Sequence, residues 1–371
     1  MKAAILQRIG SPRPYAESRP LLVDDVRIDP PGLGEIVVQI KAAGLCHSDL
    51  SVINGDRPRP TPMVLGHEAA GRVVECAPDI RDLKPGDHVV TTFVPSCGCC
   101  LPCMEGRPAL CEPAAQTNTA GTLLSGARRI FHAEKEINHH MGVSAFAEYA
   151  VVSRRSVVRI DDTLPSAQAA LFGCAVLTGV GAVVNTAKVP AGSSVAIVGL
   201  GGVGLNSLLA ARLIGARRIV AVDLNPAKLK LASELGATDT VLATPDAINE
   251  VRDLTSGGVD FAFEMAGSVP ALELAYKITR RGGTTITAGL PHPDKLLSIP
   301  PVNLVGEERT LKGSYIGSSV PARDIPRYIS LFQQGFLPID KLMSHRLRLS
   351  EINAGFDRLA DGQAVRQVIE F

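Results

Sequence analysis

A glycine-rich segment between two apolar runs constrains the fold of this chain more than any other feature. The segment Gly199–Gly204 has the pattern GxGxxG, follows the apolar run Ser194–Val198 and opens a run rich in Leu and Ala. A second apolar run ends at Asp223, 19 residues after the last glycine. This order of strand, glycine turn, helix, strand and acid predicts a βαβ unit that binds a dinucleotide with its pyrophosphate at the helix N-terminus.

Asp223 also indicates which dinucleotide binds. Its carboxylate can hydrogen-bond the ribose hydroxyls of the adenosine and would repel a 2′-phosphate. The next residues, Leu224, Asn225 and Pro226, supply no arginine to hold such a phosphate. The sequence therefore favours NAD over NADP.

The two parts of the chain differ in the pattern of their elements. Many short strands separated by turns in the N-terminal part predict a β-rich, barrel-like domain. Strands and helices alternate from about residue 176, which predicts a parallel α/β sheet. Its edge is expected at Thr310–Gly317, and from about residue 318 a helical segment and the strand Val365–Phe371 return to the first domain. Residues 112 to about 145 read as a long polar excursion.

Four cysteines at close spacing form the first metal signal. The pattern is Cys-x2-Cys-x2-Cys-x7-Cys, with the thiols of Cys97, Cys100, Cys103 and Cys111. Four thiolates predict a closed tetrahedral zinc that stabilises a loop without a core of its own. Cys99 is an extra thiol that could compete with its neighbours. The alternative is a cluster of free thiols, which would be prone to oxidation.

Three residues far apart in the sequence form the second metal signal. Cys46, His67 and Cys174 offer two thiolates and one imidazole. Three protein ligands leave a zinc one position short of tetrahedral, which is typical of catalytic rather than structural zinc. Taken singly, the cysteines fit small buried hydrophobic residues and His67 fits a core histidine; the rest of the chain outweighs that interpretation. The pair His139–His140 could bind metal, although such a pair in a loop is more often solvated.

Composition excludes several functional classes. The chain has 371 residues, 46% of them hydrophobic, and a net charge of +1, so no face is expected to attract nucleic acid or an anionic membrane. No apolar run approaches the roughly 20 residues that span a bilayer. The N-terminal sequence does not read as a signal peptide. We therefore expect a cytoplasmic protein whose eight cysteines are thiols or metal ligands rather than disulfides.

Both metal signals and the dinucleotide motif together resemble the zinc-dependent alcohol dehydrogenases of the medium-chain dehydrogenase/reductase superfamily, over essentially the whole chain. The resemblance implies a GroES-like catalytic domain at residues 1–175 and 318–371 and a Rossmann domain at residues 176–317. It implies two zinc ions per subunit, NAD, and reversible oxidation of a primary aliphatic or aromatic alcohol to the aldehyde. The segment 112–145 is similar to that of dimeric liver-type members, so we expect a homodimer, with a homotetramer as the alternative.

The resemblance also implies roles for single residues. Cys46, His67 and Cys174 would hold the catalytic zinc, with Asp49 on the ring of His67. Glu68 would approach the metal during ligand exchange, and Ser48 would take the alcohol proton. The remaining residues contact the cofactor or line the substrate pocket. Those expected at the cofactor are His47, Thr178, Gly199, Gly201, Gly202, Val203, Gly204, Asp223, Lys228 and Arg366. Those expected in the pocket are Ser48, Phe93, Leu110, His140, Met141, Leu290 and Tyr315.

Two positions depart from the liver-type pattern. Those members have an arginine on the pyrophosphate where this chain has His47, so NADH is expected to leave more easily. They also end the proton relay at a histidine where this chain has Ser51. Because serine has no useful basic pKa, the last proton step is expected to go directly to water.

Two other functions remain open from the sequence. A formaldehyde dehydrogenase that acts on a thiol adduct would share both zinc sites. It would bind a charged thiol carrier through charged pocket residues, and Arg57 is a candidate for such a residue. A non-catalytic NAD-binding protein on the same fold is the second alternative. The intact ligand set and Ser48 argue against the latter, because such a protein would not need them.

Overall fold

The computed structural model describes residues 1–371 and divides the chain into two units that are built on different kinds of sheet. The first unit consists of Met1–Cys174, Val320–Ile329 and Ile339–Phe371, and the second of Ala175–Ser319 and Ser330–Pro338. Each unit has its own buried apolar clusters.

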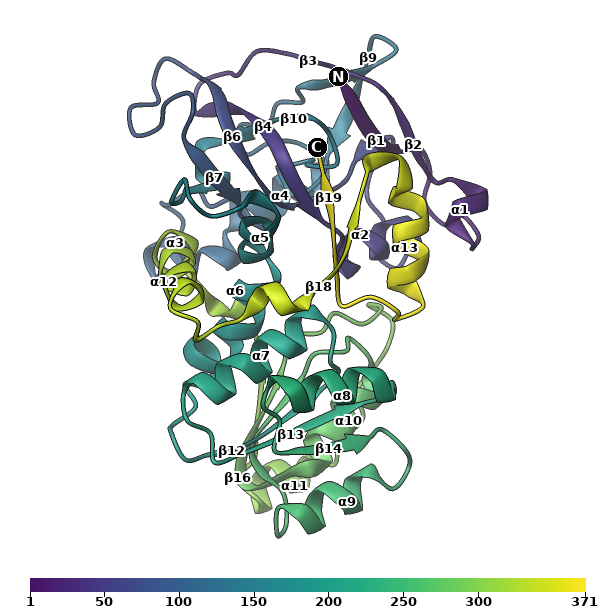
Figure 1. Ribbon diagram of the computed structural model, residues 1–371, viewed down its shortest axis with the longest axis vertical. Helices are drawn as coiled ribbons and strands as arrows, with labels where there is room; N and C mark the ends of the chain where they lie inside the picture. The colour runs from purple at the N-terminus through teal and green to yellow at the C-terminus, as the bar shows by residue number, and fades with distance from the viewer. The chain divides into compact units, whose positions relative to one another are not determined.

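Two mostly antiparallel sheets form the first unit (Figure 1), as expected for a β-rich domain. The strand orders are β2-β1-β5-β9-β8-β3 and β11-β7-β6-β4-β19-β18, and β10 also pairs with β4. The strands are β1 Lys2–Leu6, β2 Leu21–Asp25, β3 Arg27–Ile28, β4 Glu35–Gly44, β5 Met63–Val64, β6 Glu68–Cys76, β7 His88–Thr91, β8 Ile130–His132, β9 Lys135–His139, β10 Tyr149–Ser153, β11 Val157–Arg159, β18 Met343–Leu347 and β19 Arg366–Glu370.

Strand β4 is the centre of the first unit. It is ten residues long and pairs with β6, β10 and β19. Its side chains Ile36, Val38 and Ile40 are at most 1% exposed. They belong to a core that also holds the rings of Phe146 and Phe356, 6.0 Å apart and edge to face. The rigid end of β4 is therefore a suitable place from which to position a functional side chain.

Short helices connect these strands. They are α1 Tyr15–Ser18, α2 His47–Ile53, α3 Leu101–Met104, η1 Pro108–Leu110, α4 Glu112–Ala120, η2 Arg154–Ser156, α5 Ser166–Ala170, η3 Leu171–Gly173, α12 Pro321–Gln333, η6 Ile339–Leu342, η7 Leu349–Glu351 and α13 Ile352–Ala360. The expected polar excursion after Cys111 is thus partly regular, with α4, β8 and β9. Helix α4 has Pro113 in its first turn and ends at the left-handed Gly121, but it lacks the apolar stripe that would reveal it in the sequence.

The second unit is a parallel, doubly wound sheet of the Rossmann type. Its order is β14-β13-β12-β15-β16-β17, and all pairs are parallel. The strands are β12 Ser194–Val198, β13 Arg218–Asp223, β14 Asp239–Leu242, β15 Val259–Glu264, β16 Thr279–Thr287 and β17 Thr310–Gly313. The helices are α6 Ala175–Gly181, η4 Ala182–Ala187, α7 Gly202–Leu213, α8 Pro226–Leu235, α9 Ala247–Leu254, α10 Val269–Ile278, α11 Pro301–Gly306 and η5 Ile316–Ser318.

The glycine-rich turn between β12 and α7 needs its glycines for two reasons. Gly199 has a φ of +93°, a conformation that other residues rarely adopt. A Cβ atom on Gly204 would lie 1.9 Å from the carbonyl oxygen of Gly199, so the helix could not approach the turn so closely. The turn therefore keeps the tight geometry that the GxGxxG pattern predicts.

The edge strand of this sheet is shorter than expected. It ends at Gly313, whereas the sequence pattern extends it to Gly317. Ile316 and Gly317 have φ values of +48° and +63°, and they form the short helix η5 instead. The side-chain pattern alone does not reveal this turn, since Ile316 is a strong strand former.

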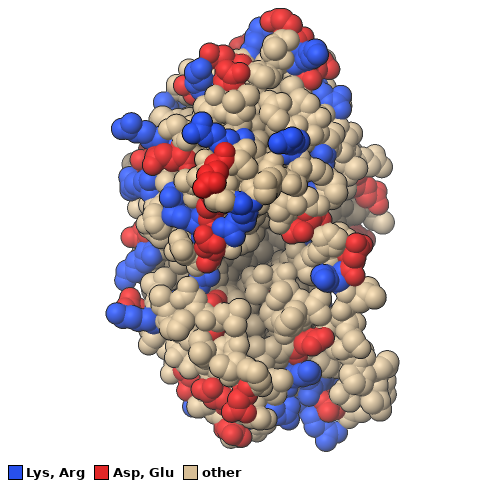
Figure 2. Space-filling view, turned by 90° about the vertical axis from the view of Figure 1, so that its right-hand side faces the viewer, with Lys and Arg blue, Asp and Glu red and all other residues tan.

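No single helix is long and apolar enough to cross a bilayer, although the consecutive pair Ser166–Gly173 and Ala175–Ala187 together matches a span in length and composition. Buried core helices pass the same test, and these helices are mostly buried. Figure 2 shows basic and acidic side chains interspersed over one face of the molecule, in keeping with the net charge of +1.

Candidate active site

The pairing of β4 with β6 brings Cys46 and His67 together. Gly44 at the end of β4 lies opposite Glu68 at the start of β6. Cys46 follows β4 as the N-cap residue of α2, and His67 immediately precedes β6. Gly66 has a φ of +92°, and a Cβ there would lie 2.6 Å from the backbone nitrogen of Phe146. Only glycine allows the chain to turn here and present His67.

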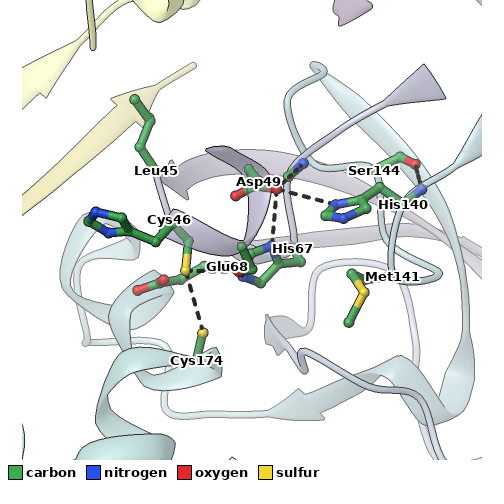
Figure 3. Close-up of polar contacts among 12 residues, drawn as sticks. Leu45, Cys46, Asp49, His67, Glu68, His140, Met141, Ser144 and Cys174 are labelled. Atoms are coloured by element: carbon green, nitrogen blue, oxygen red, sulfur yellow. Dashed lines mark hydrogen bonds and ion pairs between the residues drawn. The ribbon is translucent and has the colours of Figure 1, made fainter. Parts of the chain in front are cut away.

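Cys174 completes a cluster of potential metal ligands. It follows η3 and its Sγ lies 4.0 Å from Sγ of Cys46 (Figure 3). One ligand atom from each of Cys46, His67, Glu68 and Cys174 lies within 4.8 Å of the others. Two thiolates on one tetrahedral zinc would be about 3.8 Å apart, given Zn–S bonds of about 2.3 Å. The donor set and its spacing therefore fit zinc, with Glu68 as an additional neighbour.

The two thiols of this cluster differ in acidity. Donation of a hydrogen bond from Cys174 lowers the pKa of the Cys46 thiol well below its usual range, and this outweighs its burial. The same hydrogen bond and burial raise the pKa of Cys174. A metal ion bound between the two sulfurs would favour the thiolate form of both.

Asp49 supports His67 from behind the cluster. Its Oδ1 lies 3.1 Å from Nδ1 of His67 and accepts a hydrogen bond of 3.1 Å from the backbone N–H of Gly66. Both side chains are fully buried. Although burial raises the pKa of Asp49, the charge of His67, the close approach of His140 and the hydrogen bond with His67 hold it below its usual range. A carboxylate on Nδ1 leaves Nε2 of His67 free to bind a metal.

Glu68 and Arg366 form a second buried pair. Nη1 of Arg366 is 3.3 Å from Oε2 of Glu68 and 3.5 Å from the carbonyl oxygen of Leu45. Burial raises the pKa of Glu68 to about 7, against the opposing charge of Arg366. Oε1 of Glu68 is buried and has no hydrogen-bond partner. Arg366, expected at the pyrophosphate, therefore contacts Glu68 in this structure.

Ser48 lies beside the ligand cluster and is half-buried. Its hydroxyl donates to Sγ of Cys46 at 3.0 Å and lies 3.3 Å from Nε2 of His67. Ser51, one turn further along α2, donates to the carbonyl oxygen of His47 at 2.7 Å. The hydroxyl of Ser51 is thus engaged within the helix, while the side chain of His47 is exposed.

Four cysteines form a second, separate cluster. One ligand atom from each of Cys97, Cys100, Cys103 and Cys111 lies within 4.8 Å of the others. The backbone N–H of Cys100 donates to Sγ of Cys97, and that of Cys97 donates to Sγ of Cys111, both at 3.2 Å. Cys99 does not belong to this group and its side chain is exposed. The structure thus brings together the four thiols chosen by spacing.

The expected pocket residues fall in both units. In the first unit, the rings of Phe93 and His140 lie 4.7 and 5.8 Å from that of His67. Met141 is buried, and Leu110 is 40% exposed on η1. Leu290 and Tyr315 belong to the second unit.

His139 and His140 do not form a metal-binding pair. His139 accepts a hydrogen bond from the backbone N–H of Arg129 at 3.0 Å. Nδ1 of His140 instead lies 3.2 Å from Oδ1 of Asp49. This contact could not be predicted from the sequence, because nothing relates positions 49 and 140 before the chain is folded.

Among the expected cofactor residues of the second unit, the glycine-rich turn follows the carboxyl end of β12 and Asp223 ends β13. Asp223 accepts hydrogen bonds from the backbone N–H groups of Leu200, at 2.6 Å, and Asn225, at 2.9 Å. The acid is therefore tied to the glycine-rich turn. Thr178 is buried in α6, and Lys228 is half-buried in α8.

Two family models match the chain. The alcohol dehydrogenase GroES-like domain matches residues 32–162, and the zinc-binding dehydrogenase domain matches residues 202–334. They correspond to the β-rich first unit and to most of the parallel sheet of the second.

Relatives match over almost the whole length. The class-3 alcohol dehydrogenase of Drosophila melanogaster is 37% identical over 364 residues, which cover 96% of either chain. Benzyl alcohol dehydrogenase from Acinetobacter calcoaceticus superimposes with a TM-score of 0.92 at 31% identity, covering 100% of this chain and 99% of that one. A protein described as a zinc-binding dehydrogenase from Sinorhizobium meliloti 1021, solved bound to NADP, has a TM-score of 0.80 at 29% identity, covering 100% and 99%. Full-length similarity and the clustered ligands agree: the chain belongs to the zinc-dependent alcohol dehydrogenases of the medium-chain dehydrogenase/reductase superfamily.

Proposed function

We propose that the protein is an NAD-dependent alcohol dehydrogenase that reversibly oxidises a primary aliphatic or aromatic alcohol to the aldehyde. The observation that carries this proposal is the meeting of Cys46, His67 and Cys174 with Ser48 beside them. A protein that only bound NAD would have no use for three buried metal ligands next to a hydroxyl group.

Each metal site would have a separate task. Cys46, His67 and Cys174 would hold the catalytic zinc, which when bound supplies Lewis acidity to a substrate oxygen. Glu68, within reach of the same ligand atoms, is the acid that would approach the metal during ligand exchange. The four-cysteine cluster would hold a structural zinc, because all four positions are filled by protein. The first unit is then the catalytic domain.

Ser48 is the residue that we assign to the substrate proton. Its hydroxyl donates to Sγ of Cys46 and keeps lone pairs that can accept from an alcohol. Ser51 cannot extend this path easily, because its own proton is on the carbonyl oxygen of His47. The proton should then reach water without a histidine relay.

The second unit would bind the cofactor. Gly199, Gly201, Gly202 and Gly204 let the pyrophosphate approach the start of α7, with Val203 and Thr178 near the nicotinamide and Lys228 near the ribose. We assign NAD because Asp223 would repel a 2′-phosphate, although one relative was solved with NADP. Arg366 and His47, the other residues expected at the cofactor, belong to the first unit, where Arg366 contacts Glu68.

A substrate panel tests the proposal directly. Aliphatic, aromatic and terpenoid alcohols and their aldehydes should be assayed with NAD and with NADP, alongside zinc analysis. We expect alcohol-dependent NADH formation, a clear preference for NAD and two zinc ions per subunit. The relative that acts on benzyl alcohol makes aromatic alcohols the first to test. Absence of alcohol-dependent NADH formation would leave the non-catalytic alternative.

A second candidate function is a formaldehyde dehydrogenase that acts on a thiol adduct. The observation that favours it is the 37% identity to a class-3 alcohol dehydrogenase, with Arg57 as the candidate contact for a charged thiol carrier. Formaldehyde oxidation that requires glutathione or another thiol, and that weakens in Arg57→Ala, would establish it. Equal activity with and without thiol supports the simple alcohol dehydrogenase.

The proposal extends to where the protein is located and how its chains assemble. All eight cysteines are free thiols, which fits a reducing, cytoplasmic compartment. The edge strand β17 has a neighbour on one side only, β16. We propose a homodimer in which this edge faces its mate, with a homotetramer as the alternative.

A further inference from the structure

One carboxylate oxygen of Asp49 contacts two imidazole rings. Oδ1 lies 3.1 Å from Nδ1 of His67 and 3.2 Å from Nδ1 of His140 (Figure 3). It also accepts the hydrogen bond from Gly66. The other oxygen, Oδ2, is buried without a hydrogen-bond partner. All contacts that orient this carboxylate therefore act through Oδ1.

His140 differs from the other two donors in its geometry. Nδ1 is within ion-pair distance of Oδ1, but its direction does not meet hydrogen-bond geometry. A ring nitrogen that faces a carboxylate at this distance must carry the proton, because its lone pair would be repelled. His140 is 2% exposed, and with its proton on Nδ1 it presents an N–H dipole to Oδ1 of Asp49. Ligand atoms of Asp49, His67 and His140 all lie within 4.8 Å of one another, so the two rings approach Oδ1 from neighbouring directions.

We propose that His140 is a positioning residue that holds the Asp49 carboxylate in place for the metal ligand His67. This inference rests on the proposed catalytic metal site and adds a residue to it. Asp49 can fix the ring of His67 only while Oδ1 stays in line with Nδ1 of that ring. Without His140, the carboxylate can rotate, because Oδ2 has no partner to hold it. His140 would therefore act on the metal through two intervening side chains.

Metal affinity is the measurement that tests this role. Zinc-loaded wild type and variants should be titrated with a chromophoric zinc chelator. Because Cys46→Ala should lose the catalytic zinc, the zinc that it retains identifies the signal of the four-cysteine cluster. We expect His140→Phe to bind the catalytic zinc about tenfold less tightly, at the low end of the effect of partners of metal ligands. The four-cysteine zinc should be unchanged, which also shows that the variant is folded.

Two amide variants separate the ring nitrogens of His140. Asparagine places an N–H near the position of Nδ1, whereas glutamine reaches the position of Nε2. We expect His140→Asn to restore the zinc affinity to within about threefold of wild type and His140→Gln to fail. His139→Gln is the matched control: it changes the neighbouring buried histidine, keeps an acceptor for Arg129 N–H, and should leave both zinc affinities unchanged.

Several outcomes would overturn the inference. A catalytic zinc held equally well in His140→Phe would remove the positioning role. Rescue by glutamine but not by asparagine would move the effect to Nε2. A third zinc equivalent that disappears in His140→Phe would make His140 a ligand, in the group Asp49, His67 and His140. If wild type itself held zinc only in the four-cysteine cluster, the proposed catalytic zinc site would be wrong. This outcome differs from the ones above, in which wild type holds both zinc ions.

Discussion

At the scale of single residues, the proposed function depends most on the three metal ligands. Cys46→Ala or His67→Ala should abolish turnover and remove one zinc per subunit, because two ligands hold zinc too weakly. The four-cysteine zinc and NAD binding should remain, since both lie on other elements. Zinc analysis, NAD titration and an alcohol assay check this, with Cys76→Ala as the control for losing a thiol outside both clusters. Turnover retained in either ligand variant would contradict the assignment.

Glu68 should also make the unfolding free energy depend on pH. Burial raises its pKa from 4.5 to about 7 in the folded protein. Between these values the folded state keeps a proton that the unfolded state has released, so rising pH favours unfolding. In zinc-free protein, the unfolding free energy of wild type minus that of Glu68→Gln should fall by up to about 3 kcal/mol from pH 4.5 to 7 and then level off. Denaturant titrations at several pH values measure it; a flat difference would show that Glu68 titrates normally.

At the scale of elements, the turn before β6 decides where His67 lies. Gly66 and Gly86 both have positive φ, but a Cβ would meet Phe146 at Gly66 and nothing within 4 Å at Gly86. Gly86→Ala should cost about 1–2 kcal/mol of folding free energy for its backbone conformation. Gly66→Ala should cost at least about 3 kcal/mol, because overpacking adds to it, and should weaken the catalytic zinc. Thermal unfolding and zinc analysis compare the two; equal losses would mean that the Phe146 contact yields easily.

At the scale of elements, local patterns could be predicted from the sequence, whereas contacts between distant residues could not. The GxGxxG turn and the four-cysteine spacing are local patterns in which the residue types dictate the geometry, so both could be predicted. The contacts of Asp49 with His140 and of Glu68 with Arg366 join residues 91 and 298 positions apart and carry no local signal. β17 ends early because the chain turns at Ile316. The φ of +48° at this residue is a value that a β-branched side chain does not favour. Element type was therefore easier to predict than the contacts behind the proposed metal ligands.

At the scale of the whole molecule, the second unit has an open sheet edge and exposed apolar side chains near it in sequence. β17 is the last strand of its sheet. Val302 and Val305 on α11 are 70% and 81% exposed, and Leu296 is 85% exposed. Unpaired strand edges and exposed apolar groups are both costly in a monomer and are commonly covered by a second subunit. This is the physical basis for expecting a dimer.

Sedimentation equilibrium tests the dimer. One chain has a mass of 39.1 kDa, so a dimer should have about 78 kDa, twice that value. The double variant Val302→Asp and Val305→Asp should shift the mass to that of the monomer, because two carboxylates would lose their water in the interface. Leu33→Asp is the matched control: Leu33 is 77% exposed in the first unit, and its replacement should leave the dimer intact. A double variant that stays dimeric would place the interface elsewhere, and a wild type near four times the chain mass would favour the tetramer.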